Sequence, residues 1–288
     1  MRPSAVCTRD GYLRPLTSAL ILAETPDDWS QGIPLVYVQE VADCWLETYD
    51  MNRVADRLNA YPQFTTTLDG VEVHMLHARS SNPNAKPLII TQGWPGSVME
   101  FLKVIGPLTE PQEHGGNAED AFHVALQDPE HCKGIHLNMV FAPPSAELME
   151  DLTKLEQSAL AGMQHYQDWD SGYSKQQSTR PQTVGYGLVD SPVGQMAWIL
   201  EKFWAWTDCD GRPENVLTRD EMLDNVMVHW LNAAGASSAR LYWESFGSGG
   251  AGDVIVTPMG DSIFPKEILR TSRRWAEARF TTSCTGMS

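Results

Sequence analysis

The stretch Leu88-Ile-Ile-Thr-Gln-Gly-Trp-Pro-Gly-Ser97 decides the fold class of this sequence. An apolar run typical of a buried strand leads into a turn rich in glycine and proline, and a helix is predicted over Val98–Ile105. A strand followed by a glycine turn and a helix is typical of an α/β protein. Backbone N–H groups at such a strand end point toward the sheet edge where ligands usually bind. The turn is therefore a candidate site, although an ordinary strand-to-helix connection explains a short glycine motif equally well.

Upstream of this stretch, the sequence predicts an N-terminal extension of helices and a β-hairpin. Residues 27–60 read as helical, with a second helical stretch that starts after Asp50 and ends near Asn59. Two β-rich runs within residues 64–77 flank Asp69-Gly70, the strongest short hairpin signal in a sequence. The apolar face of the first helix consists of Leu35, Val38, Val41, Ala42 and Trp45.

Downstream, the sequence predicts more strands around a long helical insert. The predicted strands cover residues 121–124, 134–139 and 254–258, and residues 145–245 are helix-rich and contain many tryptophans. A flexible glycine loop is predicted over Gly247–Gly252. This order favours an α/β core that carries a helical cap.

Composition narrows the class of function. The 288 residues, 42% hydrophobic and 20% charged, are typical of a soluble globular protein. A net charge of −16 argues against a nucleic-acid partner, because polyphosphate binding needs a cationic surface. The apolar run Leu16–Ala23 is too short to span a membrane, so we expect no membrane span and a cytoplasmic protein. Reduced thiols are expected from five scattered cysteines: Cys7, Cys44, Cys132, Cys209 and Cys284.

A series of motifs resembles the epoxide hydrolases of the microsomal (juvenile-hormone and xenobiotic) type in their family order. They are Asp28-Trp-Ser-Gln-Gly-Ile-Pro-Leu35, Pro62-Gln-Phe-Thr-Thr66, Gly93-Trp-Pro-Gly-Ser-Val-Met-Glu-Phe101, Ser171-Gly-Tyr173, Pro181-Gln-Thr-Val-Gly185, Asp190-Ser-Pro-Val-Gly194, Ile199-Leu-Glu-Lys-Phe203, Ser238-Ala-Arg-Leu-Tyr242 and Phe264-Pro-Lys-Glu267. The resemblance implies an α/β-hydrolase-like core with an incomplete sheet and a helical cap. It divides the chain into an N-terminal region (1–80), the core (81–144 and 250–288) and the cap (145–249).

The resemblance implies addition of water to a small apolar epoxide in two steps. An aspartate at a strand-to-helix elbow attacks an epoxide carbon and forms a hydroxyalkyl ester, while two cap tyrosines donate to the oxygen. A histidine, oriented by a carboxylate, then activates the water that hydrolyses the ester. Neither a metal nor a cofactor is implied.

Four residues of this chain fall on family site positions. Tyr173 and Tyr242 match the two tyrosines, Glu267 matches the orienting carboxylate, and Trp94 matches the oxyanion-hole residue that acts through its backbone N–H. Gln92 stands where the family usually has histidine. Each position also has an ordinary structural explanation: a buried aromatic ring with a bonded hydroxyl, or a solvated glutamate at a helix start.

The nucleophile segment is missing from the resemblance. The family has a strand and a Gly-Gly-Asp-Trp-Gly-type elbow where Ala121-Phe-His-Val124 here runs directly into Ala125-Leu-Gln-Asp-Pro-Glu-His131. Asp128 matches a non-catalytic position. The family's Gly-Gly-His-Phe motif is also unmatched; the chain ends in residues 281–288, and no histidine follows His229. His131 and His136 are expected to be structural.

The sequence therefore predicts an epoxide hydrolase by descent that, as written, is inactive and poorly stable. Removing a central strand orphans buried amides, at about 1–3 kcal/mol each. The alternative is a non-catalytic protein that keeps the cap pocket and binds an epoxide or diol. Another acyl-transfer hydrolase of the same fold is disfavoured, because no Gly-x-Ser-x-Gly elbow is present. The sequence does not indicate which epoxide is used or what the oligomeric state is.

Overall fold

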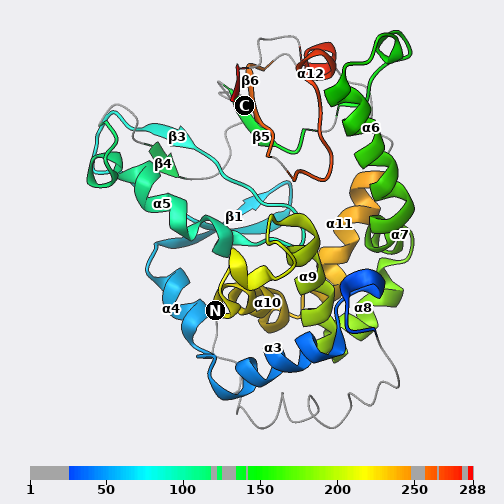
Figure 1. Cartoon of the computed structure of the whole chain (residues 1–288). Helices are drawn as coiled ribbons and strands as arrows, with labels where there is room; N and C mark the ends of the chain where they lie inside the picture. The colour runs from blue at the N-terminus through cyan, green and yellow to red at the C-terminus, as the bar shows by residue number, and fades with distance from the viewer. Residues whose placement is uncertain are drawn as a thin grey trace. The chain divides into compact units, whose positions relative to one another are not determined.

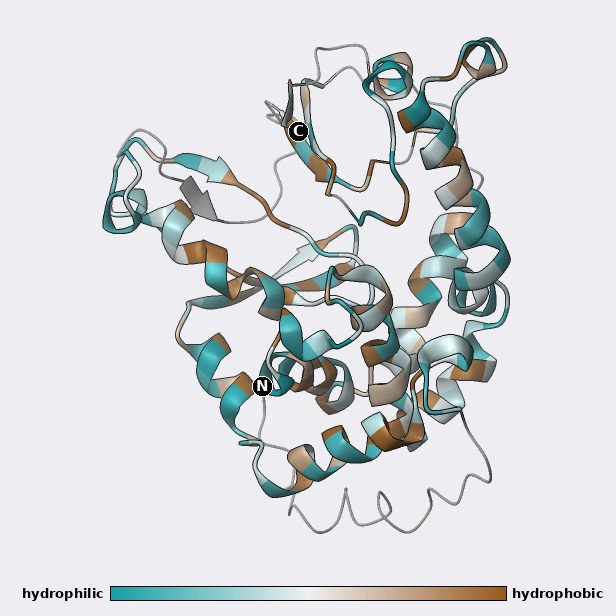
Figure 2. Cartoon of the chain, viewed as in Figure 1, coloured by the Kyte–Doolittle hydropathy of each residue, from teal (hydrophilic) through white to brown (hydrophobic). Residues whose placement is uncertain are grey.

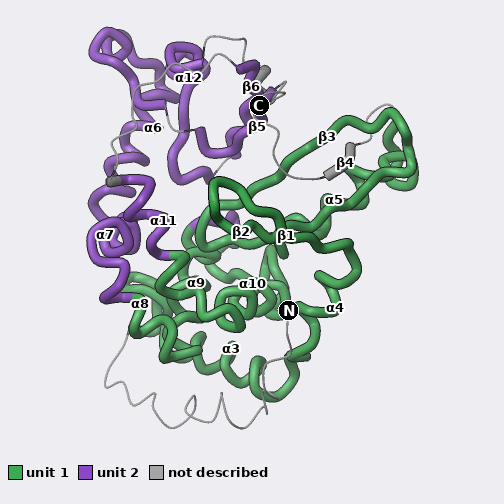
Figure 3. The backbone as a smooth tube through the Cα atoms, turned by 180° about the vertical axis from the view of Figure 1, so that it is seen from behind, with its two compact units in different colours: residues 1–127, 185–205, 209–238 green, residues 128–184, 206–208, 239–288 purple. Residues whose placement is uncertain are grey.

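The structure is a computed structural model, and its described residues form two compact units (Figures 1 and 3). The first unit comprises residues 1–127, 185–205 and 209–238, and the second comprises residues 128–184, 206–208 and 239–288. Each unit is considered by itself, and the division into N-terminal region, core and cap stays a prediction. The described residues are 26–117, 122–124, 134–140, 142–247, 257–264, 266–280 and 285–287.

The first unit contains the two helices expected near the N-terminus. Helix α3 covers Leu35–Glu47 and helix α4 covers Arg53–Asn59, which confirms the helical reading of this region. The chain turns between them at Asp50, whose side-chain oxygen accepts a hydrogen bond from the Asn52 amide at 3.0 Å. Asp50 and Asn52 are turn formers, because their short polar side chains bond to nearby backbone groups.

The predicted hairpin is confirmed. Strands β1 (Gln63–Leu68) and β2 (Val71–Leu76) pair antiparallel with Leu68 opposite Val71. The two turn residues both have positive φ, 49° at Asp69 and 84° at Gly70. A two-residue turn of this kind matches the twist of the strands, and aspartate and glycine tolerate its left-handed backbone.

Among the described residues, each unit contains one parallel sheet, and the incompleteness of the core sheet stays a prediction. In the first unit, β3 (Lys86–Leu88) pairs with β4 (Phe122–Val124). In the second unit, β5 (Ile135–Asn138), β6 (Met259–Ser262) and β7 (Thr285–Met287) pair in that order. Among the described residues no strand links the two sheets.

Two strand predictions need correction. The strand expected over Leu88–Thr91 instead covers Lys86–Leu88, and Ile89 is 39% exposed after it, in a segment that Figure 2 colours as hydrophobic. The described pairing with β4 ends with Leu88 opposite Val124. Of the strand expected over 254–258, residues 254–256 lie outside the described residues, and the described strand begins later, at Met259.

Helices dominate the region predicted to be helix-rich, which confirms that reading. A 3-10 turn (Val98–Phe101) and α5 (Leu102–Thr109) follow the glycine turn, as expected. No helix within the described ranges is long and apolar enough to cross a membrane. The remaining helices are α6 (Lys154–His165), a π-helical turn (Tyr166–Asp170), α7 (Gly172–Thr179), α8 (Pro181–Asp190), α9 (Pro192–Trp206), α10 (Arg219–Leu231), α11 (Gly235–Gly247) and α12 (Arg273–Arg279).

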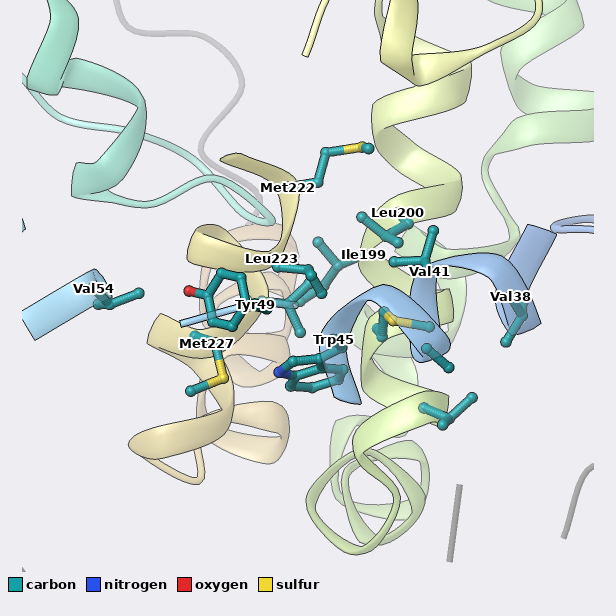
Figure 4. Close-up of a cluster of buried hydrophobic side chains, with 14 of the residues drawn as sticks. Val38, Val41, Trp45, Tyr49, Val54, Ile199, Leu200, Met222, Leu223 and Met227 are labelled. Carbon is teal, nitrogen blue, oxygen red and sulfur yellow. The ribbon is translucent and has the colours of Figure 1, made fainter. Parts of the chain in front are cut away.

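The main core of the first unit is built from α3, α4, α9 and α10 (Figure 4). Val41, Trp45, Leu200 and Leu223 are each 0% exposed in it. Burying one such side chain contributes about 1.5–3 kcal/mol, so this helical cluster is the main source of stability in the unit. The predicted apolar face of α3 lies here, except that Leu35 is only partly buried and Tyr37 joins the face.

A buried ionic cluster joins these helices. The Asp224 carboxylate on α10 is fully buried and accepts a hydrogen bond from the Tyr49 hydroxyl at 2.8 Å. Arg53 Nε donates to its two oxygens at 3.0 and 3.1 Å, and Arg57 donates as well. A buried carboxylate is tolerated only when its lone pairs are filled, and these three side chains fill them.

We predict that Asp224→Ala lowers the free energy of unfolding by about 3 kcal/mol. The loss lies at the low end for a buried pair because the Arg53 and Arg57 side chains stay 32% and 26% exposed. Urea denaturation measures the loss of unfolding free energy. The matched control is Asp220→Ala on the same helix, because the exposed ion pair of Asp220 with Arg53 should contribute less than about 1 kcal/mol. Equal losses in the two variants would contradict the cluster's importance.

A second buried carboxylate organises the other unit. Glu156, 1% exposed at the start of α6, accepts from the Thr153 amide at 2.9 Å and from Ser272 Oγ at 2.7 Å. Arg274 on α12 also donates to it, at 2.9 and 3.0 Å. The Thr153 amide, with Ser272, Thr153 Oγ1 and Arg274, lowers the pKa of Glu156 to about 2 against the opposing effect of burial.

This depressed pKa predicts acid sensitivity of the second unit. The carboxylate contributes stability above its ordinary pKa of 4.5, and that contribution is lost as the pH falls from there to about 2. In Glu156→Gln this part of the acid dependence should disappear while the protein is less stable at neutral pH. The free energy of unfolding, measured across this pH range, tests the prediction, and the exposed Glu150→Gln is the control. An unchanged fall in stability with acid in Glu156→Gln would refute the prediction.

Candidate active site

The glycine turn after β3 is held by α10. Trp94 is buried, with 9% of its surface exposed, and the Pro95 carbonyl accepts two hydrogen bonds from this helix. Asn225 Nδ2 donates to it at 2.7 Å and His229 Nε2 lies 3.1 Å from it. The turn is therefore built to a fixed conformation, as an oxyanion-binding backbone must be. The oxyanion role of Trp94 stays a prediction.

The two glycines of the turn have different surroundings. A Cβ at Gly96 would lie 2.3 Å from Gln92 Cγ, whereas a Cβ at Gly93 would meet no atom within 4 Å. A side chain at position 96 would therefore have to displace the Gln92 side chain. Gln92, which replaces the family histidine, donates through Nε2 to Glu100.

Sequence reasoning missed the role of Asn225 and His229. Both side chains are buried and reach the same carbonyl. Their spacing of four residues on one helix is the only sequence signal for this pair. Because the carbonyl belongs to a segment 130 residues away, that signal does not name the partner.

We predict that His229 makes the first unit sensitive to mild acid. Burial lowers the pKa of His229 below its ordinary 6.5, although bonds to the Pro95 and Gly96 backbone act the other way. The neutral form of His229 therefore stabilises the fold above pH 6.5, and this contribution is lost as the pH falls below 6.5. Urea denaturation should show a fall in stability from about pH 7 to about pH 5 that His229→Gln reduces and the exposed His74→Gln does not. The same slope in all three proteins would contradict it.

In the second unit, the structure brings the two predicted tyrosines together. The rings of Tyr173 on α7 and Tyr242 on α11 meet edge to face, with centroids 5.7 Å apart and an interplanar angle of 78°. A third phenol joins them: the Tyr166 and Tyr173 hydroxyl oxygens are 3.1 Å apart. Sequence reasoning did not single out Tyr166. The two predicted tyrosines thus belong to a cluster of three phenols.

Both predicted tyrosines are held in the protonated form. Burial raises the pKa of Tyr173, and hydrogen bonds with Tyr166 and Tyr242 raise it further. Burial also raises the pKa of Tyr242, with the bond to Tyr173 acting the other way. A phenol that keeps its proton at neutral pH can donate to a developing alkoxide.

Aromatic rings flank the phenols. Trp206 meets the Tyr173 ring with centroids 5.3 Å apart, and Phe246 meets the Tyr242 ring at 5.4 Å. Phe246 follows Tyr242 by four residues on α11 and remains 66% exposed. An apolar ligand that places its oxygen near the hydroxyls would find hydrophobic surface beside it.

Glu267, the predicted orienting carboxylate, is half-buried. Its carboxylate accepts a hydrogen bond from the Phe264 amide at 3.2 Å. Burial raises the pKa of Glu267, and a second carboxylate, Asp261, raises it further. Asp261 is 6% exposed on β6 and its Oδ1 has no hydrogen-bond partner. Sequence reasoning missed this second carboxylate.

Other sequence expectations can now be placed. His136 bridges two strands, with Nε2 3.1 Å from Ser262 Oγ, which agrees with a structural role. Cys44 and Cys209 carry free thiols. Among the described residues no group of three or more His, Cys, Asp or Glu is arranged to hold a metal. The remaining positions, Cys7, Cys132, Cys284, Asp128, His131, the apolar run 16–23, the segment 125–131, the loop 248–252 and the end 281–284, lie outside the described residues.

Comparison with solved structures identifies the fold. The fold is similar to juvenile hormone epoxide hydrolase from the silkworm Bombyx mori, with a TM-score of 0.79 and 21% identity, covering 96% of this chain and 86% of that one. It is also similar to Aspergillus niger epoxide hydrolase, with a TM-score of 0.76 and 23% identity, covering 93% and 84%. The fold is that of the α/β-hydrolase epoxide hydrolases, as predicted.

Sequence comparison identifies the family. Residues 1–101 match the family described as Epoxide hydrolase N terminus. A protein of Stigmatella aurantiaca (strain DW4/3-1) classed as an epoxide hydrolase is 42% identical, over 90% of this chain and 71% of the relative. Epoxide hydrolase 1 of Sus scrofa is 28% identical, over 85% and 72%. The chain belongs to the epoxide hydrolase family.

Proposed function

We propose that this chain binds a small apolar epoxide through the hydroxyls of Tyr173 and Tyr242 and, as written, does not convert it to a diol. The observation that carries the proposal is the pair of protonated, touching phenols in the second unit. Two donors that converge on one oxygen suit an epoxide, whose only polar atom is an acceptor.

The internal junction at Val124-Ala125 supports the absence of turnover. No Gly-Gly-Asp-Trp-Gly-type elbow occurs in the sequence to supply a carboxylate nucleophile. The match with the Stigmatella aurantiaca relative runs over 313 positions, more than the 288 residues of this chain, so that relative has residues where this chain has none. Without a nucleophile no hydroxyalkyl ester forms, and oxygen activation alone does not open the ring at a useful rate.

We expect styrene oxide to bind the chain without being consumed. Ligand-observed NMR should detect binding, and Tyr173→Phe and Tyr242→Phe should each weaken it about 2- to 10-fold, the effect of one lost hydrogen bond. Tyr186→Phe, which removes an exposed phenol from α8, is the control and should leave binding unchanged. Chromatography should detect no diol above the buffer background, and intact-mass spectrometry no adduct.

Two results would contradict the proposal. Diol formation or a covalent adduct would mean that the chain carries a nucleophile elsewhere. No binding of styrene oxide or of its diol, 1-phenyl-1,2-ethanediol, would mean that the phenols do not form a ligand site. The mass of the native protein adds a separate check: a value well above 32.1 kDa, with peptides inserted between Val124 and Ala125, would assign turnover to a longer form.

A second candidate function is a dedicated binding protein for epoxides or diols. The same phenols favour it, since binding needs no nucleophile. It is distinguished by preference: a binding protein for the product should hold 1-phenyl-1,2-ethanediol more tightly than styrene oxide, because two hydroxyls can pair with more than one phenol.

A further inference from the structure

The third phenol of the cluster belongs to an unusual piece of helix. Tyr166 is the first residue of the π-helical turn Tyr166–Asp170, which lies between α6 and α7. Single π turns inside helices occur frequently at functional sites, because they redirect side chains that a regular helix would place elsewhere. Tyr173 follows this turn, one residue into α7.

Side-chain hydrogen bonds hold the turn in place. Gln164 Nε2 donates to Asp168 Oδ1 at 2.9 Å, and Ser171 Oγ donates to the Gln167 carbonyl at 2.9 Å. His165 Nε2 lies 3.6 Å from Asp170 Oδ2. Tyr166 is therefore presented from a fixed backbone, and its hydroxyl reaches that of Tyr173 at 3.1 Å.

We propose that Tyr166 is a positioning residue for Tyr173, an inference that rests on the proposed epoxide-binding role of Tyr173 and Tyr242. When an epoxide is bound, the Tyr166 hydroxyl donates to the Tyr173 oxygen, which leaves the single Tyr173 proton to point at the epoxide oxygen. A hydroxyl that accepts one hydrogen bond while donating another is polarised and becomes the stronger donor. No covalent bond changes in this step.

The geometry explains why Tyr173 needs such a partner. A phenol O–H can take more than one orientation unless a neighbour fixes it, and the neighbours of the Tyr173 hydroxyl include Tyr166 and Tyr242. When Tyr242 donates to the ligand, Tyr166 is placed to donate to the Tyr173 oxygen, since the two hydroxyl oxygens are 3.1 Å apart. Tyr166 is half-buried in the π-helical turn, which ends just before Ser171, whereas Tyr173 lies in α7. Tyr166 can therefore bond to Tyr173 without being one of the two phenols that are proposed to bind the epoxide.

A double-mutant cycle with styrene oxide tests the proposal. Tyr166→Phe should weaken binding about 2- to 10-fold in the otherwise unchanged protein, as expected for one hydrogen bond. In the Tyr173→Phe background the same substitution should change the affinity less than about 2-fold, because the residue through which Tyr166 acts has lost its hydroxyl. A full effect of Tyr166→Phe in both backgrounds would overturn the proposal.

A spectroscopic measurement separates this inference from the proposed function. In protein labelled with 13Cζ-tyrosine, the Tyr173 signal, identified by its loss in Tyr173→Phe, should shift in Tyr166→Phe and stay in place in the control Tyr186→Phe. If styrene oxide does not bind at all, the proposed function fails while the shift still reports whether Tyr166 holds the Tyr173 hydroxyl. A Tyr173 signal that does not move in Tyr166→Phe would overturn the positioning role.

Discussion

One buried charge, the Asp224 carboxylate, sets how the helices of the first unit are joined. Its three donors come from Tyr49, just after α3, and from Arg53 and Arg57 on α4, so the cluster ties the N-terminal helices to α10. The next residue on α10, Asn225, donates to the Pro95 carbonyl. Satisfying a buried charge fixes the position of α10, and α10 in turn fixes the glycine turn. Stability and the candidate oxyanion turn are therefore coupled through one helix.

The second unit uses its carboxylates in two ways. Glu156 is buried with its oxygens filled by amide, hydroxyl and guanidinium donors, which keeps it ionised and joins α6 to α12. Asp261 is buried with one oxygen unpartnered, and burial raises its pKa and contributes to that of Glu267. The contrast fits a structural role for Glu156, whereas Asp261 and Glu267 are carboxylates whose pKa values burial raises.

The pairing of β3 bears on the proposed loss of turnover. β3 pairs with β4 for three residues and the chain then leaves the ladder, so the apolar run at Ile89 is partly exposed. In a parallel sheet each interior strand satisfies two neighbours, and an absent strand leaves backbone groups on both sides at about 1–3 kcal/mol each where they are buried. Under the proposed function, the residues that this chain lacks at Val124-Ala125 would include both such a strand and the elbow that carries the nucleophile. The cost to the fold and the loss of turnover would then have one origin.

Local signals in the sequence were enough for the helices α3 and α4, the Asp69-Gly70 hairpin and the α/β class, because periodicity and turn chemistry are written in neighbouring residues. Tyr173 and Tyr242 were singled out only by the resemblance to the family, and the structure then showed that their rings meet. The ends of the strands were not predictable, since Ile89–Thr91 has strand character but a strand exists only where a partner satisfies its backbone. Asp224, Asn225, His229 and Asp261 looked like ordinary helix or loop residues. Only the tertiary structure showed that each is buried against segments more than 100 residues away or left without a partner, because burial and long-range hydrogen bonds are properties of the packed chain.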